Sequence, residues 1–152
     1  MISVEEYFTN PTTGEVKPHT LQDQENARDL LARVEAIAEE YASDTEADGH
    51  DIDPDTGTEI SGTHGGSGDG GFRMHNSTTG TDHSSHRQAL GVDKSDQSNA
   101  FDDWLTSYDL EGGEFNEKLS KHGLYREAPG ATNTWSHLST RSPHSGRRTF
   151  QP

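Results

Sequence analysis

The sequence predicts an α+β domain in which a small antiparallel sheet is flanked by helices. Apolar residues recur at spacings of three and four over residues 21–42, as they do on the buried face of a helix. Two shorter apolar patterns, which begin at Ser98 and at about Glu114, indicate two more helices. Residues 124–127 and the alternating residues 134–139 predict two strands joined by a turn.

The first of these helices has the clearest pattern. Thr20 can cap it, with Asp23 three residues later as the partner in a capping box. Its apolar stripe consists of Ala27, Leu30, Leu31, Val34, Ile37, Ala38 and Tyr41. The opposite face, which we expect to be solvated, carries Arg28, Arg33, Glu35, Glu39 and Glu40.

The two later helices are shorter. Ser98 is expected to cap the second one, whose apolar residues are Phe101, Trp104, Leu105 and Tyr108. The third is expected over residues 114–122, with Phe115 and Leu119 pointing inward and Gly123 as its C-terminal stop.

Two segments lack strong periodicity. Residues 1–19 contain a turn signal and are expected to form an extended arm ahead of a single domain over residues 20–152. Residues 51–57 have the composition of a calcium loop without its twelve-residue ligand spacing, so a solvated turn is expected there. Residues 58–62 are compatible with a short strand. Residues 65–71 are expected to be a flexible loop rather than a phosphate-binding loop, because no Gly-Lys-Ser/Thr follows.

The composition is strongly acidic, with 27 acidic against 12 basic residues and a formal net charge of −15. Leu, Ile, Val and Phe together number only 22 residues, which taken alone would suit a disordered chain. Adaptation to high salt is the second interpretation, because a Debye length of about 3 Å at molar salt screens the self-repulsion of such a surface. The periodic segments favour the second interpretation and a folded domain.

Composition also bears on the class of protein. Binding to nucleic acid or to anionic lipid needs a basic face, and a net charge of −15 argues against both, although residues 147–150 form a small basic patch. The chain contains no cysteine, so disulfides and cysteine zinc sites are excluded. No apolar run approaches the roughly 20 residues that span a bilayer, and the N-terminus does not resemble a signal peptide.

Histidines cluster in the middle of the chain, where His75, His83 and His86 fall within twelve residues. A metal site in a chain without cysteine must use His, Asp or Glu as ligands. His86 and Asp93 are seven positions apart, and a loop that leads into a strand can return both side chains to one point. The spacing alone is weak evidence, because a histidine and an aspartate at this separation are common.

The residues around this pair are more specific. Residues 84–93 resemble the first metal motif of the zinc D-alanyl-D-alanine carboxypeptidase and endopeptidase family, in which Ser-x-His is followed by two small residues and then by Asp. Ala89 and Gly91 fill the small positions, in the reverse of the usual order. Residues 135–137, Trp-Ser-His, resemble the later strand that carries the family's third ligand. The order of elements is similar to that of the family, and of its viral members, over roughly residues 20–150.

The resemblance implies a hedgehog-type peptidase fold and one zinc ion bound by His86, Asp93 and His137. It also implies that Arg73, in the word Gly-Gly-Phe-Arg, binds a substrate carbonyl or carboxylate and stabilises the developing oxyanion. Ser84 is expected to support the site from behind the ligands.

Three further residues have a subsidiary place in this resemblance. Asn76 resembles the asparagine that follows the family's arginine word. His83 and His144 are the reserve ligands, and both are expected to face solvent.

The chain departs from the family at the general base. The family places an Asp or Glu three residues before the last histidine, and Thr134 stands at that position here. A threonine cannot take a proton from an activated water. Glu127, on the strand expected to pair with the one that carries His137, is the nearest carboxylate in the sequence and the candidate base; an ordinary strand-edge glutamate is the alternative.

Two functions are therefore expected. The first is a zinc-dependent peptidase or amidase that acts on cell-envelope peptide bonds, as a viral endolysin or virion-associated hydrolase. The second is a structural or binding protein of the tail or particle of a halophile virus, which keeps the peptidase fold without efficient turnover. The expected partners are an envelope peptide or glycoprotein and other virion proteins, with no nucleic acid and no membrane insertion. The expected location is the host cytoplasm before lysis or the assembled virion.

Overall fold

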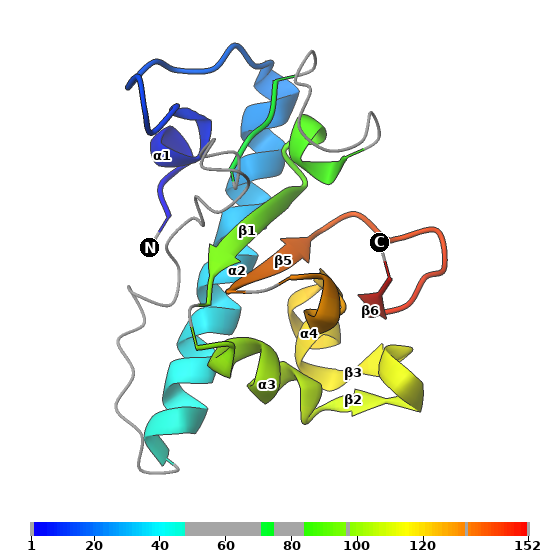
Figure 1. Ribbon diagram of the computed structural model, residues 1–152. Helices are drawn as coiled ribbons and strands as arrows, with labels where there is room; N and C mark the ends of the chain where they lie inside the picture. Colours follow the sequence, from blue (N-terminus) through cyan, green and yellow to red (C-terminus); the bar gives the residue numbers. More distant parts are fainter. Residues whose placement is uncertain (1, 48–70, 75–83, 97, 133, 152) are drawn as a thin grey trace.

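The computed structural model describes residues 2–47, 71–74, 84–96, 98–132 and 134–151, and it has the α+β architecture that the sequence predicts. The expected strand at residues 58–62 and the loops around it lie outside the described residues. Figure 1 shows the long helix α2 running behind strands β1 and β5. The helices are α1 (Val4–Phe8), α2 (Leu21–Ala47), α3 (Ala100–Thr106) and α4 (Glu117–His122), with 3₁₀ turns at Ser85–Gln88 (η2), Glu111–Gly113 (η3) and Pro129–Ala131 (η4).

Four strands form the main sheet, in the order β1-β5-β4-β6. Their bounds are β1 (Gly91–Ser95), β4 (Tyr125–Glu127), β5 (Trp135–Ser139) and β6 (Thr149–Phe150). The first three strands of this order are antiparallel, as expected, whereas β6 joins β4 in parallel. A separate small hairpin pairs β2 (Asp109–Leu110) with β3 (Phe115–Asn116).

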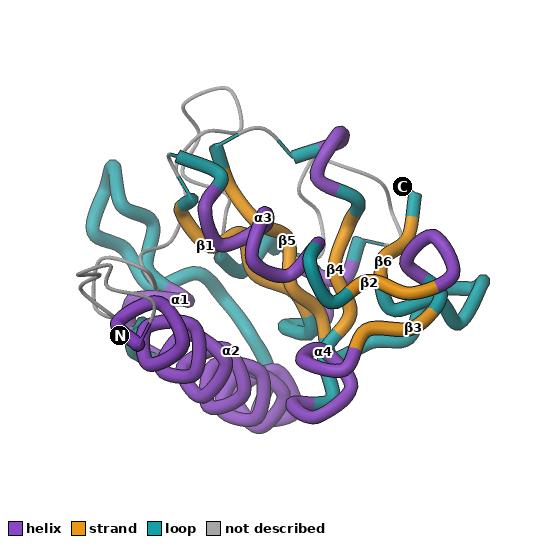
Figure 2. Tube along the Cα trace, turned by 90° about the horizontal axis from the view of Figure 1, so that it is seen from below, coloured by secondary structure: helices purple, strands orange, loops and turns teal. Residues whose placement is uncertain are grey.

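The two faces of the sheet differ in what they contact. Residues opposite one another on paired strands point to the same face, and successive residues alternate. Val92 and Leu138, which are paired, lie in the hydrophobic core with residues of α2 and α3. Asp93 and His137, paired at the next position, therefore point to the opposite face. Figure 2 shows α2 lying along one side of the strands.

Helix α2 begins where the sequence predicts and extends beyond the expected end at residue 42. The backbone N–H of Thr20 donates to Asp23, and the N–H of Asp23 donates to the Thr20 hydroxyl, which is the reciprocal pattern of a capping box. The predicted apolar stripe is buried along its whole length. Helix α2 contributes six residues to the hydrophobic core, which it shares with residues of the sheet and of the shorter helices.

The N-terminal segment is not an extended arm. Ser3 caps the short helix α1 by accepting from the N–H of Glu6, and Tyr7 and Phe8 are both buried in the main core. The Tyr7 hydroxyl donates to the carbonyl of Gly91 at the start of β1, over 2.7 Å. A five-residue helix is too short to show a repeating stripe, which is why the sequence pattern did not reveal it.

The later helices also differ from expectation at their starts. The side chain of Asp96, rather than Ser98, accepts from the N–H groups at the start of α3, those of Phe101 and Asp102. Residues 114–116 are not helical, because β3 takes Phe115, whose side chain is 57% exposed rather than inward. The predicted stop at Gly123 is confirmed, since this glycine has a left-handed φ of 63° at the end of α4.

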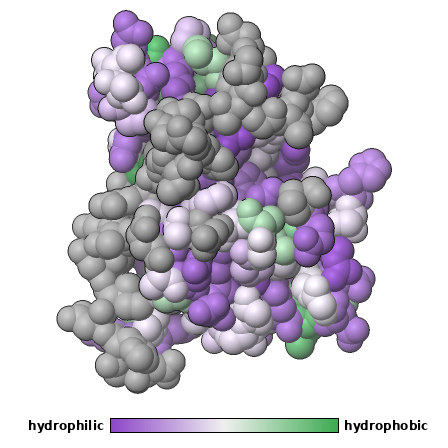
Figure 3. Space-filling model, in the orientation of Figure 1, coloured by the Kyte–Doolittle hydropathy of each residue, from purple (hydrophilic) through white to green (hydrophobic). Residues whose placement is uncertain are grey.

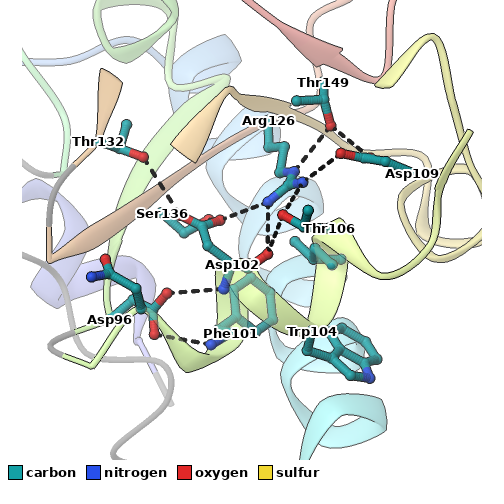
Figure 4. A network of polar contacts seen from close by, with 12 residues as sticks. Asp96, Phe101, Asp102, Trp104, Thr106, Asp109, Arg126, Thr132, Ser136 and Thr149 are labelled. Atoms are coloured by element: carbon teal, nitrogen blue, oxygen red, sulfur yellow. Dashed lines mark hydrogen bonds and ion pairs between the residues drawn. The ribbon is translucent and has the colours of Figure 1, made fainter. Parts of the chain in front are cut away.

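A buried polar network lies on the core side of the sheet. Arg126 of β4 is fully buried, and its guanidinium donates to both the carboxylate and the carbonyl of Asp102. The same guanidinium contacts Thr106, Asp109 and Thr149, and the Asp102 carboxylate accepts from Ser136 of β5. Figure 4 shows Arg126 at the centre of these contacts. The network joins α3 to four strands, β2, β4, β5 and β6.

The predicted solvated face of α2 is only partly solvated. Glu40 is half-buried and pairs with Lys118, Lys121 and His122, all of α4, at 2.7, 3.2 and 2.6 Å. Arg33 also reaches α4, where it donates to the carbonyl of His122. This charged contact, rather than an apolar one alone, ties α4 to the middle of α2.

The visible surface of the described residues is mainly hydrophilic. Where the face in Figure 3 is coloured, purple and white predominate and the green areas are small and separate, as suits the acidic composition. None of the described helices combines the length and the apolar character needed to cross a bilayer.

We expect Arg126→Met to lower the free energy of unfolding by about 3–5 kcal/mol, because it leaves the buried carboxylate of Asp102 without its partner. Arg126→Met combined with Asp102→Asn should be less destabilised than the single variant, since the uncompensated charge is gone. Chemical denaturation measures both. Arg28→Met, on the exposed face of α2, is the control and should change stability by less than about 0.5 kcal/mol. Equal stability of Arg126→Met and the wild type would contradict the account of this network.

The pH dependence of stability should reveal the Glu40 cluster. Burial raises the pKa of Glu40, but hydrogen bonds from Lys118, His122 and Lys121 outweigh it and lower the pKa from 4.5 to about 2. A depressed folded-state pKa contributes stability above the unfolded pKa, and this contribution disappears as the pH falls from about 4.5 towards 2. The difference in unfolding free energy between wild type and Glu40→Gln should therefore shrink over that range. A difference that stays constant between pH 7 and pH 2 would exclude this linkage.

Candidate metal centre

Three side chains from separate elements converge on the side of the sheet that faces away from the hydrophobic core. His86 comes from η2, Asp93 from β1 and His137 from β5, and all three are buried. The Nε2 atom of His86 lies 3.2 Å from Nδ1 of His137 and 3.3 Å from Oδ1 of Asp93. The Nδ1 atom of His137 lies 2.8 Å from the same Asp93 oxygen. Among the described residues this is a group that can hold a metal ion.

Each histidine has its outer nitrogen fixed by a hydrogen bond. Nδ1 of His86 lies 2.8 Å from the carbonyl of Gly71, an acceptor, so this nitrogen carries the proton and donates. Nε2 of His137 lies 3.2 Å from the Oγ atom of Ser85. For His86 this leaves the inner nitrogen, Nε2, with a lone pair that faces Asp93. The Ser85 hydroxyl can accept a proton from Nε2 of His137, which would free Nδ1 of that ring to bind a metal ion. A hydrogen bond at the outer nitrogen is the usual means of orienting a metal-binding histidine.

The pairing of β1 with β5 places two of the three ligand atoms. Asp93 and His137 are direct cross-strand partners, so their side chains leave the sheet side by side. Gly91, two residues earlier on the same face, provides the room for this arrangement. A Cβ atom at Gly91 would lie 2.2 Å from Ser85 Oγ and 3.0 Å from Cε1 of His137. A glycine at position 91, two residues before Asp93, is therefore a steric requirement of the site.

Arg73 lies beside the convergent group, as the sequence predicts. One guanidinium nitrogen is 3.6 Å from Oδ2 of Asp93, and another donates to the hydroxyl of Ser84 over 3.3 Å. Ser84 also accepts from the backbone N–H of His86, so its predicted supporting position is observed. The Arg73 N–H in turn donates to the carbonyl of His86. These contacts hold a positive charge next to the outer oxygen of Asp93.

The electrostatics of the two histidines differ. Burial lowers the pKa of His86, and the charge of Asp93 opposes this only in part. Burial also lowers the pKa of His137, but the hydrogen bond and the charge of Asp93 outweigh it and raise the pKa overall. Two imidazole nitrogens and a carboxylate oxygen within 3.3 Å of one another need a proton or a cation between them. The arrangement therefore favours a positively charged occupant.

Glu127 lies on the same face as this group. Strand β4 pairs with β5 as expected, with Arg126 opposite Leu138, and continuing that register places Glu127 opposite His137. Phe150 of β6 is the partner of Glu127 on the other side. Asp93, His137, Glu127 and Phe150 thus form one row across all four strands. The half-buried Glu127 is near enough for its charge to raise the pKa of His137.

Thr134, three residues before His137, has an unusual backbone. Its φ is 71°, in the left-handed region that β-branched residues rarely adopt. Two backbone contacts hold it there: its N–H donates to Asn99 Oδ1, and its carbonyl accepts from the N–H of Asp96. The turn before β5 is thus fixed by contacts with the segment before α3.

The remaining candidates have simpler outcomes. His144 is exposed, as predicted. His75, Asn76 and His83 lie outside the described residues. Sequence reasoning did not find Ser85 or the Gly71 carbonyl as the partners of the two histidines. The carbonyl of Gly71 belongs to the backbone, which every residue has, so the sequence does not mark it as a partner of His86. Ser85 can be recognised as the partner of His137 only from the folded structure, in which η2 lies beside β5.

The chain was compared with family models, with curated proteins and with solved structures, and none of them matches.

We expect Ser85→Ala to weaken metal affinity by about 10- to 100-fold, because His137 loses the partner that orients its ring. Competition with a chromogenic chelator measures the affinity. Ser142→Ala, at an exposed position beyond β5, is the matched control and should bind metal like the wild type. Unchanged affinity in Ser85→Ala would show that the contact does not orient the ligand.

Proposed function

We propose that the protein is a zinc-dependent peptidase that hydrolyses peptide bonds of a cell envelope. The observation that carries the proposal is the convergence of His86, Asp93 and His137, with Glu127 on the same row of the sheet. Three protein ligands are the number used by catalytic zinc sites, which keep a further position for water or substrate. The resemblance of residues 84–93 and 135–137 to the zinc D-alanyl-D-alanine peptidases points to the same chemistry.

The choice of zinc is supported by ligand type and spacing. Two imidazoles and one carboxylate suit zinc, with bond lengths of about 2.0–2.2 Å. The edge of a tetrahedron with such bonds is about 3.3 Å. The two distances from His86 Nε2, 3.2 and 3.3 Å, have this length, and the 2.8 Å between His137 and Asp93 would widen slightly.

Each protein group has a distinct part in the proposed reaction. Zinc held here would polarise an amide carbonyl and activate water for attack on it. Glu127 would accept the proton of that water and pass it to the leaving amine, as a general acid–base residue. Arg73 holds Asp93 in place and adds positive charge where the carbonyl oxygen becomes negative. Its second contact, with Ser84, keeps the guanidinium from turning away.

The setting proposed for this activity follows from resemblance and composition. Viral members of the resembled family suggest an endolysin or a virion-associated hydrolase, and the acidic surface suggests a halophilic host. The substrate class would be an envelope peptide, either a peptidoglycan stem peptide or the polypeptide of an envelope glycoprotein.

One observation favours a second function. Thr134 stands where the resembled family has its base, and its strained backbone is held by Asn99 and Asp96. If Glu127 does not take the proton, the chain would be a metal-holding structural or binding domain of a virion.

Kinetics of the Glu127→Gln variant separate these two functions. We expect zinc-loaded wild type to cleave peptides that end in D-alanyl-D-alanine or to cleave envelope glycoprotein. The Glu127→Gln variant should have a kcat about 10²- to 10⁴-fold lower than that of the wild type, because proton transfer is removed. It should still bind one zinc ion per chain. Glu114→Gln, in the exposed turn before β3, is the matched control.

A gain-of-function variant completes the test. Thr134→Asp places a carboxylate at the family's base position, and aspartate tolerates a left-handed backbone better than threonine does. This variant should be active even when combined with Glu127→Gln. If wild type and His137→Ala are equally inactive on both substrates while zinc is bound by the wild type, the structural function replaces the peptidase.

A further inference from the structure

The charge of the chain is distributed very unevenly along the sequence. All 27 acidic residues lie within residues 1–127, whereas residues 128–152 contain Arg141, Arg147 and Arg148 and no acid. That basic segment includes β5 and β6, two of the four strands of the sheet. A cationic segment of a strongly anionic protein therefore lies at the sheet that carries the candidate metal centre.

Two of these arginines are held by backbone carbonyls rather than by carboxylates. Arg147 donates to the carbonyls of Glu111 and Gly112, and Arg148 donates to the carbonyl of Leu124 over 3.0 Å. Among the residues that the structure describes, no carboxylate forms an ion pair with either of them. Within that part of the chain, therefore, no acidic side chain neutralises their charge, although the sequence has more than twice as many acids as bases.

Arg148 is also fixed in direction. Its guanidinium lies over the ring of Tyr125, with 4.3 Å between the guanidinium carbon and the ring centroid. Stacking of this kind holds the guanidinium plane and leaves its edge available for a second ligand. Tyr125 and Arg148 are both half-buried, so the pair is accessible from solvent.

The register places this pair on the same face as the metal ligands. Tyr125 is opposite Ser139, two residues along β5 from His137 and therefore on the same side of the sheet. Arg148 precedes Thr149 in β6, whose side chain points to the core side, where it contacts Arg126. The row formed by Ser139, Tyr125 and Arg148 is thus the neighbour of the row that contains His137 and Glu127.

The distance between the row that contains His137 and the row that contains Arg148 determines how long a peptide must be to contact both. Two strand spacings of about 4.8 Å and two residues of about 3.3 Å separate Cα of His137 from Cα of Arg148, or about 12 Å in all. Allowing for the length of the arginine side chain, an extended peptide would span the gap with roughly two or three residues. Glu127 would repel an acidic side chain placed closer to the metal, which favours the more distant position.

We propose that Arg148, stacked on Tyr125, forms a subsite for an acidic residue, so that the preferred substrate is a peptide with Glu or Asp two or three residues from the scissile bond. The proposal rests on the peptidase function and names the substrate class. The guanidinium would pair with the substrate carboxylate through two parallel hydrogen bonds. The subsite selects the substrate and takes no part in the chemical step.

Binding of alanine hexapeptides labelled with fluorescein tests the subsite. In each peptide one alanine is replaced by Glu, Gln or Lys, at each position in turn, and anisotropy is measured with zinc-loaded protein at the lowest salt that keeps the protein folded. The best Glu peptide should bind wild type about tenfold more tightly than its Gln counterpart, and the Lys peptide should bind most weakly. This comparison needs no variant, so it does not depend on how a variant folds.

Variants then assign the preference to Arg148. Arg148→Gln should abolish the difference between Glu and Gln peptides, and Arg148→Lys should keep part of it, because the charge remains and the stacked fork is lost. Arg28→Gln, on the exposed face of α2, removes the same charge and should leave the preference intact. Equal binding of the Glu and Gln peptides to wild type, or a full preference in Arg148→Gln, would overturn the proposal.

Hydrolysis of the same peptides separates this proposal from the peptidase function. Cleavage without a preference for Glu would contradict the subsite and support the peptidase. A tenfold binding preference that depends on Arg148, without any cleavage, would support an acidic-peptide site and contradict the peptidase.

Discussion

The candidate site depends on the pairing of β1 with β5. In this register Asp93 stands opposite His137, so the two ligand side chains leave adjacent strands at the same level. A slip by one residue would turn one of them to the core side, where Val92 and Leu138 now pack. The apolar pair thus fixes the register, and the register assembles the polar pair. His86 is added by the 3₁₀ turn before β1, whose Ser85 contacts His137 in return.

A buried polar network on the core side of the sheet also supports this register. The apolar residues of this side are few, and Arg126, Asp102 and Ser136 occupy positions that a larger core would fill with aliphatic side chains. Ser136 immediately precedes His137 in β5. Its hydrogen bond to Asp102 therefore fixes β5 on the core side, next to the residue whose side chain points to the candidate metal centre. Buried charges are costly unless they are paired, and here Arg126 has acidic partners in both Asp102 and Asp109. Burial raises the pKa of Asp102 while Arg126 opposes that rise, which reflects this balance.

The sequence predicted the elements that have a repeating pattern or a cap with one clear chemistry. Helix α2, the stop at Gly123 and the strands near residues 125 and 135 belong to this class. The sequence did not predict helix α1, because five residues are too few to show a repeating apolar pattern. It also did not predict the cap of α3, because the capping side chain is that of Asp96, two residues before the expected Ser98. For the site, the resemblance of residues 84–93 and 135–137 to a family's motifs, rather than the spacing alone, indicated the three side chains that converge. The hydrogen bonds to Ser85 and to the Gly71 carbonyl arise from tertiary packing and leave no mark on the sequence.

The account of function depends on a metal ion at this point of the sheet, and its most direct test is the metal content of the purified protein. Elemental mass spectrometry of wild type, after exposure to zinc and removal of the excess, should find one zinc per chain. His137→Ala should have lost it, whereas His144→Ala, which removes an exposed histidine, should retain it. A wild type without stoichiometric metal, or equal metal in wild type and His137→Ala, would contradict the account.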